Sequence, residues 1–224
     1  MAEITLNRYL AKLEALQKQG LHHEVSLHAR HILEKYPKNA AAHRLLAHAL
    51  LAANQHDEAE HEFRRVLSAY PDDADPYMGL SRIAAFHRRY DEAIGYAERA
   101  ADLKPGDADI ARALRDMYAD QRGIRDARIP QGAYTLALQQ RRAGLLNRAV
   151  DTLKAAVAQH PERIDLRVLL AEIHWDNESP IEAAELAIEI LKGLPNCLSA
   201  NRVLTQLCLI FARTDSDALT GTAR

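Results

Sequence analysis

The sequence predicts an all-α protein built from stacked helix–turn–helix repeats. Prolines recur 34 residues apart at Pro37, Pro71 and Pro105, and again at Pro161 and Pro195. Hydrophobic residues make up 48% of the chain, but only three are Phe and one is Trp, so the interior is rich in Ala and Leu, which favours helices over sheets. A fixed period of this length indicates a repeat architecture, in which each unit buries its apolar face against its neighbours.

The second helix of each repeat can be aligned on the proline that follows it. The aligned segments are 23–37, 57–71, 91–105, 147–161 and 181–195, and one shared position in them holds Val25, Ala59, Ala93, Ala149 and Ala183. A small side chain at this position lets the backbones of two antiparallel helices approach closely. The proline then ends the helix and begins the connection to the next repeat.

The first helix of each repeat carries a Leu followed by a small residue. This pair recurs in register as Leu46–Ala47, Leu80–Ser81, Leu136–Ala137 and Leu170–Ala171. Between the two helices of a repeat, Gly20, Asn54 and Gly144 occupy equivalent turn positions, where Gly and Asn best tolerate a left-handed backbone. Each repeat is therefore predicted to be a pair of closely packed helices joined by a tight turn.

The fourth repeat breaks the period, because Pro105 and Pro161 are 56 residues apart. Residues 107–122 still fit a first helix, but Arg115 stands where the other repeats have a small contact residue. Its long side chain would prevent a second helix from packing closely against the first. We predict an extended strap over 123–130, anchored by Ile124 and Ile129, in place of the second helix. This divides the chain into a first sub-array at 1–122, the strap, a second sub-array at 131–211 and a disordered tail at 212–224.

With its five registered units, the chain resembles the tetratricopeptide repeat family over residues 6 to about 211. The resemblance implies a right-handed α-solenoid, here interrupted in the fourth repeat, with a concave groove lined mainly by the first helices. It also implies a non-enzymatic scaffold that binds a peptide or protein segment in this groove. The positions that match groove-facing sites of the family are Arg44, His48, Leu51, Met78, Arg82, Phe86, Arg112, Asp116, Tyr134, Leu138, Arg141, Val168, Glu172 and Trp175.

The first half of this groove is expected to be basic and partly apolar. Arg44, His48 and Arg82 would lie beside Met78 and Phe86. Such a trough suits an extended peptide that carries acidic groups or a free C-terminal carboxylate. The partner is therefore expected to be a protein or peptide with acidic character.

The remaining features argue against other classes of function. The net charge of −2 disfavours a nucleic-acid binder, and no run of about 20 apolar residues is present to span a membrane. The N-terminus lacks the apolar core of a signal peptide, and Cys197 and Cys208 are too far apart along one helix for a disulfide. These observations favour a soluble, cytoplasmic protein.

No catalytic motif and no cofactor site is recognisable in the sequence. His28 and His31 are one helical turn apart among eleven histidines, but no third metal ligand has an obvious place, so a metal-dependent enzyme is the weakest alternative. A second alternative is a regulatory or targeting module of a larger protein that continues past Arg224. It is motivated by the apolar final helix, 198–211, for which the sequence supplies no partner helix. The oligomeric state is left open.

Overall fold

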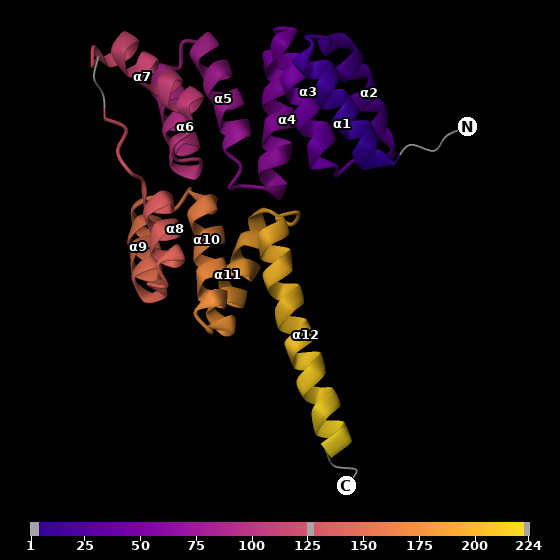
Figure 1. The fold of residues 1–224 in the computed structure, drawn as a ribbon, viewed down its shortest axis with the longest axis vertical. Helices are drawn as coiled ribbons and strands as arrows, with labels where there is room; N and C mark the ends of the chain where they lie inside the picture. Colours follow the sequence, from indigo (N-terminus) through magenta and orange to yellow (C-terminus); the bar gives the residue numbers. More distant parts are fainter. Residues whose placement is uncertain (1–4, 125–127, 222–224) are drawn as a thin grey trace. The chain divides into compact units, whose positions relative to one another are not determined.

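The structure is a computed structural model that describes residues 5–124 and 128–221, without the side chains of residues 213–221 (Figure 1). Within these residues all regular elements are α-helices, which confirms the predicted all-α class. The helices are α1 (Leu6–Lys18), α2 (His22–Lys35), α3 (Ala40–Ala52), α4 (His56–Ala69), α5 (Ala74–Phe86), α6 (Tyr90–Leu103), α7 (Ala108–Arg122), α8 (Ala133–Arg142), α9 (Leu146–Gln159), α10 (Ile164–Asp176), α11 (Pro180–Gly193) and α12 (Leu198–Gly221).

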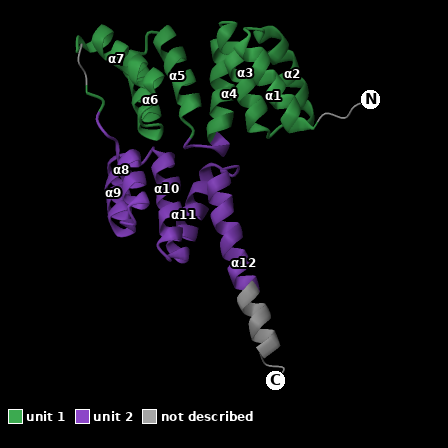
Figure 2. Cartoon of the chain, in the orientation of Figure 1, with its two compact units in different colours: residues 1–67, 73–129 green, residues 68–72, 130–224 purple. Residues whose placement is uncertain are grey.

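The chain divides into two compact units (Figure 2). Unit 1 comprises Met1–Leu67 and Asp73–Ile129, and unit 2 comprises Ser68–Asp72 and Pro130–Arg224. Each unit consists of helix pairs of the predicted kind, α1 to α7 forming most of unit 1 and α8 to α12 most of unit 2.

The small residues of the repeat lie where neighbouring helices touch. Ala47, Ala59 and Ser81 have no exposed surface, and the Ser81 hydroxyl donates a 2.8 Å hydrogen bond from α5 to the carbonyl oxygen of Ala93 on α6. These contacts confirm that the recurring small residues allow the two helices of a repeat to approach closely.

One contact between repeats is unusually close. The ring of Phe63 on α4 lies against the backbone of Gly79 on α5, and a Cβ atom at residue 79 would stand only 2.3 Å from ring carbons of Phe63. Phe63 is completely buried, so its ring has no free space into which it could move. The second and third repeats therefore pack together only because residue 79 has no side chain.

The turns inside the repeats adopt the left-handed conformation that the sequence predicts for Gly20, Asn54 and Gly144, with φ values of 81°, 59° and 73°. Arg88 and Glu178 occupy the equivalent turns with φ values of 60° and 55°. Neither residue type favours this region, so the turn geometry is imposed by the packing of the helices that it joins.

The fourth repeat begins as predicted and then departs from the pattern. The Asp107 side chain caps α7 by accepting hydrogen bonds from the backbone N–H groups of Asp109 and Ile110, at 3.0 and 3.1 Å. The helix ends at Gly123, which is left-handed with φ 68°. Residue 124 and residues 128–132 are not helical, and the rest of the predicted strap, 125–127, lies outside the described residues.

Two details of the predicted junction differ from the structure. Ile129 packs against the core of unit 1, but Ile124 is 49% exposed and is not an apolar anchor. The next helix does not start directly after the predicted strap, at residue 131, because Gly132 at its N-cap is still extended and α8 begins at Ala133. A further difference is at the C-terminus, where α12 covers residues 212–221, a stretch predicted to be disordered. No proline interrupts this stretch, so the local hydrogen bonds of the helix can continue along it.

Candidate functional site

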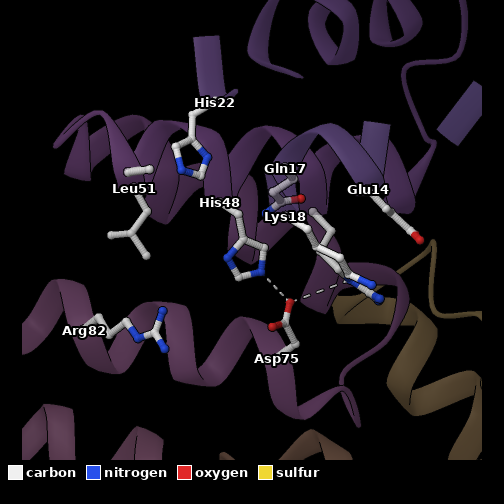
Figure 3. Close-up of a pocket in the computed structure, with 10 residues that line it drawn as sticks. Glu14, Gln17, Lys18, His22, His48, Leu51, Asp75 and Arg82 are labelled. Atoms are coloured by element: carbon white, nitrogen blue, oxygen red, sulfur yellow. Dashed lines mark hydrogen bonds and ion pairs between the residues drawn. The ribbon is translucent and has the colours of Figure 1, made fainter. Parts of the chain in front are cut away.

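A groove of about 660 Å³ opens on unit 1, where α1, α3 and α5 supply most of its walls (Figure 3). Arg44, His48 and Leu51 lie at a spacing of four and three residues, which places them on one face of α3. We call this surface the unit 1 groove. Its lining residues are Glu14, Gln17, Lys18, His22, Arg44, His48, Leu51, Ala52, Asp75 and Arg82.

Two aspartates at the start of α5 hold part of the basic lining. The guanidinium of Arg44 donates to the Asp73 carboxylate, and His48 Nε2 lies 2.7 Å from Oδ2 of Asp75. Figure 3 shows His48 and Asp75 facing each other, with Arg82 further along α5. Asp73 also accepts a 3.1 Å hydrogen bond from the backbone N–H of Asp75, so Asp73 both pairs with Arg44 on α3 and caps α5.

The two aspartates differ in their environment. Burial raises the pKa of Asp73, and the positive charge of Arg44 only partly opposes this effect. Burial also acts to raise the pKa of Asp75, but the hydrogen bond with His48 and the charges of His48, Arg44 and Arg82 outweigh it and lower the pKa. Asp75 is therefore a stable negative charge in the middle of the groove.

The rest of the lining has polar groups without partners. Among the described residues, Lys18 and Arg82 make no hydrogen bond and no ion pair, although the charge of Arg82 acts on Asp75 at longer range. Nδ1 of His22 and Nε of Arg44 are buried and have no hydrogen-bond partner in the described part of the chain. Buried polar atoms are normally satisfied, so the groove presents an incomplete set of hydrogen bonds.

The structure brings four of the predicted groove residues of unit 1 together, namely Arg44, His48, Leu51 and Arg82. It places the other four elsewhere: Met78 is buried in the core of unit 1, Phe86 is 62% exposed and stacks on His56, Arg112 lies 3.4 Å from Asp109, and Asp116 is exposed. The predicted neighbours Met78 and Phe86 therefore do not line the unit 1 groove.

In unit 2 a smaller cavity, of about 290 Å³, brings the predicted residues Arg141, Glu172 and Trp175 together. Its charges are paired: Arg141 contacts Glu172 at 3.3 Å and also Asp176, and Arg202 donates to Glu172 at 2.6 Å. The predicted groove residues Tyr134 and Val168 are buried, and Leu138 is half-buried. These ion pairs connect α8, α10 and α12, and the two positive charges of the cavity are matched by two negative ones.

Sequence reasoning missed six of the ten lining residues, namely Glu14, Gln17, Lys18, His22, Ala52 and Asp75. Part of the signal was available, because Glu14 and Gln17 precede His48 and Leu51 by 34 residues, one full period. The role of Asp75 had no such signal, since it depends on how the first turn of α5 faces α3.

The histidines that suggested a metal have other neighbours. His28 shares a 2.6 Å hydrogen bond with the hydroxyl of Tyr9, and His31 lies 3.2 Å from the carboxylate of Glu34. Across the side chains that the structure describes, those of residues 5–124 and 128–212, no three His, Cys, Asp or Glu residues gather in a metal-binding geometry. The same residues contain no helix with the length and hydropathy of a transmembrane segment.

The sequence profile of the tetratricopeptide repeat matches residues 44–108 and 134–196, more than half of the chain. The chain belongs to the tetratricopeptide repeat (TPR) family. The stretch between the two matched ranges contains most of α7 and the predicted interruption. The TPR fold is commonly a protein-interaction module.

Several solved structures are similar to this TPR chain. YrrB, described as a TPR protein with an unusual peptide-binding site, is 16% identical, with a TM-score of 0.44 over 88% of this chain and 91% of its own. TTC0263, a thermophilic TPR protein of Thermus thermophilus, is 19% identical, with a TM-score of 0.45 over 89% and 97%. MamA is 14% identical, with a TM-score of 0.44 over 92% and 99%. No curated protein matches the sequence, and the family assignment rests on the profile match.

Proposed function

We propose that this TPR protein is a non-enzymatic scaffold that binds a protein segment in the unit 1 groove through an acidic group of that segment. The observation that carries the proposal is the set of unpartnered cations and nitrogen atoms in the groove. Lys18 and Arg82 provide two cations without an ion pair among the described residues, and His22 and Arg44 contribute buried nitrogens without hydrogen bonds. A carboxylate accepts hydrogen bonds from several ammonium and guanidinium groups at once, such as those of Lys18, Arg82 and Arg44.

The remaining walls of the groove limit what else can bind. Asp75 and Glu14 oppose a densely acidic ligand, because two of the five charged lining residues are themselves carboxylates. Leu51 and Ala52 offer apolar contact beside them. The proposed ligand is therefore a segment with one carboxylate, from a side chain or the C-terminus, next to an apolar side chain rather than a polyacidic tail.

The test removes the unpaired cations and leaves the structural ones in place. Arg44 is unsuitable, since it holds Asp73 at the cap of α5. In the double variant Lys18→Ala, Arg82→Ala, both unpaired cations are lost. Peptides would first be selected from a random heptapeptide library with free C-termini, against the wild-type protein, and their affinity for both proteins measured by calorimetry.

We expect the selected peptides to carry a carboxylate beside an apolar residue and to bind the double variant roughly 100-fold more weakly, the effect of two charge-assisted hydrogen bonds. The matched control is Lys12→Ala, Arg115→Ala, which removes one Lys and one Arg from exposed positions outside the groove. Equal affinity for wild type and groove variant, with far-UV circular dichroism unchanged, would exclude the unit 1 groove as the binding site.

A further inference from the structure

The apolar surface of α12 continues beyond the core of unit 2. Cys197, just before the helix, and Ala200 and Val203 within it are buried, the two helix residues against α10 and α11. Figure 1 shows α12 beginning beside these two helices and then leading away from them. Further along, large apolar side chains face the solvent, with exposed fractions of 58% for Leu209, 45% for Ile210 and 56% for Phe211.

The part of α12 that runs from the buried Val203 to these exposed side chains has no charge. Residues 203–212, VLTQLCLIFA, contain no Asp, Glu, Lys, Arg or His, and residues 207–211 are five consecutive apolar side chains. Successive residues of an α-helix turn by about 100°, so these five point to every side of α12. Such a run of apolar side chains is unusual on the surface of a monomeric protein and marks an interaction surface, because removing it from water lowers the free energy.

The lack of charge also points to a particular occupant. A neutral apolar surface is its own complement: two copies that bury it against each other desolvate no ionised group and oppose no like charges. Two-fold pairing requires only one self-complementary patch on each subunit. A partner selected by its charge pattern would find nothing to recognise on this segment.

We infer that the 203–212 segment of α12 pairs with the same segment of a second copy of this chain, as an antiparallel helix pair. The 24 residues of α12 span about 36 Å, against about 20 Å for a 13-residue helix such as α10, so α12 has length left over for a partner beyond its contacts with α10 and α11. Antiparallel packing also sets the two helix dipoles in opposition.

Cys208 provides a site at which the proposed helix pair can be cross-linked. Its thiol is exposed and lies in the middle of the segment, whereas Cys197 is buried. In an antiparallel pair centred on the segment, the two Cys208 side chains come close to the two-fold axis. A short bis-maleimide cross-linker should therefore join two chains through Cys208, and Cys208→Ser should abolish the product.

The main test measures the mass of the full chain by sedimentation equilibrium over a wide range of concentrations. We expect the mass to rise from 25.1 kDa towards twice this value as concentration increases. The variant Leu209→Lys, Ile210→Lys places charges on exposed positions of the segment and should weaken dimerisation by roughly 100-fold.

The matched control is Ile181→Lys, Ile188→Lys on α11, which charges two apolar residues that are 65% and 49% exposed but lie outside the segment. This control should dimerise like the wild type. A wild-type chain that remains at 25.1 kDa at every concentration overturns the inference, and so does a dimer that the α11 variant disrupts and the α12 variant does not. A wild-type monomer whose binding of a hydrophobic dye is lost in the α12 variant would also overturn it, and would assign the segment to a different occupant.

Discussion

At the scale of single residues, His43 is a buried cation that joins two helices. It lies on α3 with 7% of its surface exposed, its Nδ1 facing the carboxylate of Glu62 on α4 and its Nε2 3.0 Å from the carbonyl oxygen of Pro37. Neither acceptor carries a hydrogen, so both ring nitrogens must donate, and the ring is an imidazolium.

The pKa values of this pair follow from these contacts. Burial acts to lower the pKa of His43, but the hydrogen bonds to Glu62 and Pro37 and the charge of Glu62 raise it above its ordinary 6.5. Burial acts to raise the pKa of Glu62, but the hydrogen bond and charge of His43 hold it below its ordinary 4.5. Both groups are therefore more strongly charged in the folded protein than in the unfolded chain.

The stability of the protein should depend on pH through this pair. The contribution of His43 is complete below pH 6.5 and is lost as the pH rises through its raised folded pKa. The contribution of Glu62 is complete above pH 4.5 and is lost as the pH falls through its lowered folded pKa. Urea unfolding of wild type and His43→Asn across this range should show the largest difference in the free energy of unfolding between pH 4.5 and 6.5. A difference that does not vary with pH would contradict this account.

Arg88 offers a test of backbone strain at one residue. It is left-handed with φ 60°, and among the described residues its side chain has no hydrogen bond or ion pair. Arg88→Gly should raise the free energy of unfolding by up to about 1 kcal/mol, because glycine adopts this conformation without steric cost. The gain is reduced by the greater conformational entropy that glycine gives the unfolded chain. Gly20→Ala, at the equivalent turn with φ 81°, should lower stability. Thermal denaturation of both variants would reveal the opposite signs, and a destabilised Arg88→Gly would show that the turn carries no strain.

At the scale of helices, the sequence predicts contacts inside a repeat better than contacts between repeats. The small residues Ala47, Ala59 and Ser81 recur every 34 residues and are buried as expected, because their role repeats with the period. Gly79 has no such signature: its role depends on one large neighbour, Phe63, that other repeats replace with smaller side chains. Periodicity identifies what repeats, and unique contacts depend on three-dimensional packing.

Adding a single methyl group at residue 79 should destabilise the contact between α4 and α5. In Gly79→Ala the new Cβ would meet ring carbons of Phe63 at 2.3 Å, and the buried ring cannot withdraw, so we expect a loss of about 1–3 kcal/mol in the free energy of unfolding. The control is Gly95→Ala on α6, where a Cβ meets no atom within 4 Å and helix propensity should add up to about 1 kcal/mol. Urea unfolding followed by far-UV circular dichroism measures both. Similar stabilisation of the two variants would mean that Phe63 has room to move.

The groove shows the same limit on prediction. Register from the repeat identified Arg44, His48 and Arg82 as neighbours, because first helices present equivalent faces. It could not show that Asp73 and Asp75 turn back from the start of α5 and pair with two of these three bases. The expected basic trough is therefore a mixed one, and the charge left for a ligand lies on Arg82 and on Lys18 of α1.

At the scale of the whole molecule, the broken period is the main irregularity that the sequence reveals. The interval from Pro105 to Pro161 predicts a junction, and one of the boundaries between the two compact units lies between Ile129 and Pro130. In a repeat protein each unit gains stability mainly from its immediate neighbours, so cooperative unfolding is expected to extend only as far as the stacking is regular. We therefore expect the two units to unfold separately.

Trp175 makes this expectation measurable, since it is the single tryptophan of the chain and packs against the core of unit 2. Its fluorescence reports the unfolding of unit 2, whereas far-UV circular dichroism reports the helices of both units. Gly79→Ala in unit 1 should shift part of the circular dichroism transition to lower urea and leave the fluorescence midpoint unchanged. Leu153→Ala, which opens a cavity at a fully buried position in unit 2, should instead shift the fluorescence midpoint to lower urea by an amount that corresponds to about 2–5 kcal/mol. A fluorescence midpoint that moves with Gly79→Ala as far as the circular dichroism does would show that the chain unfolds as one cooperative array across residues 123–130.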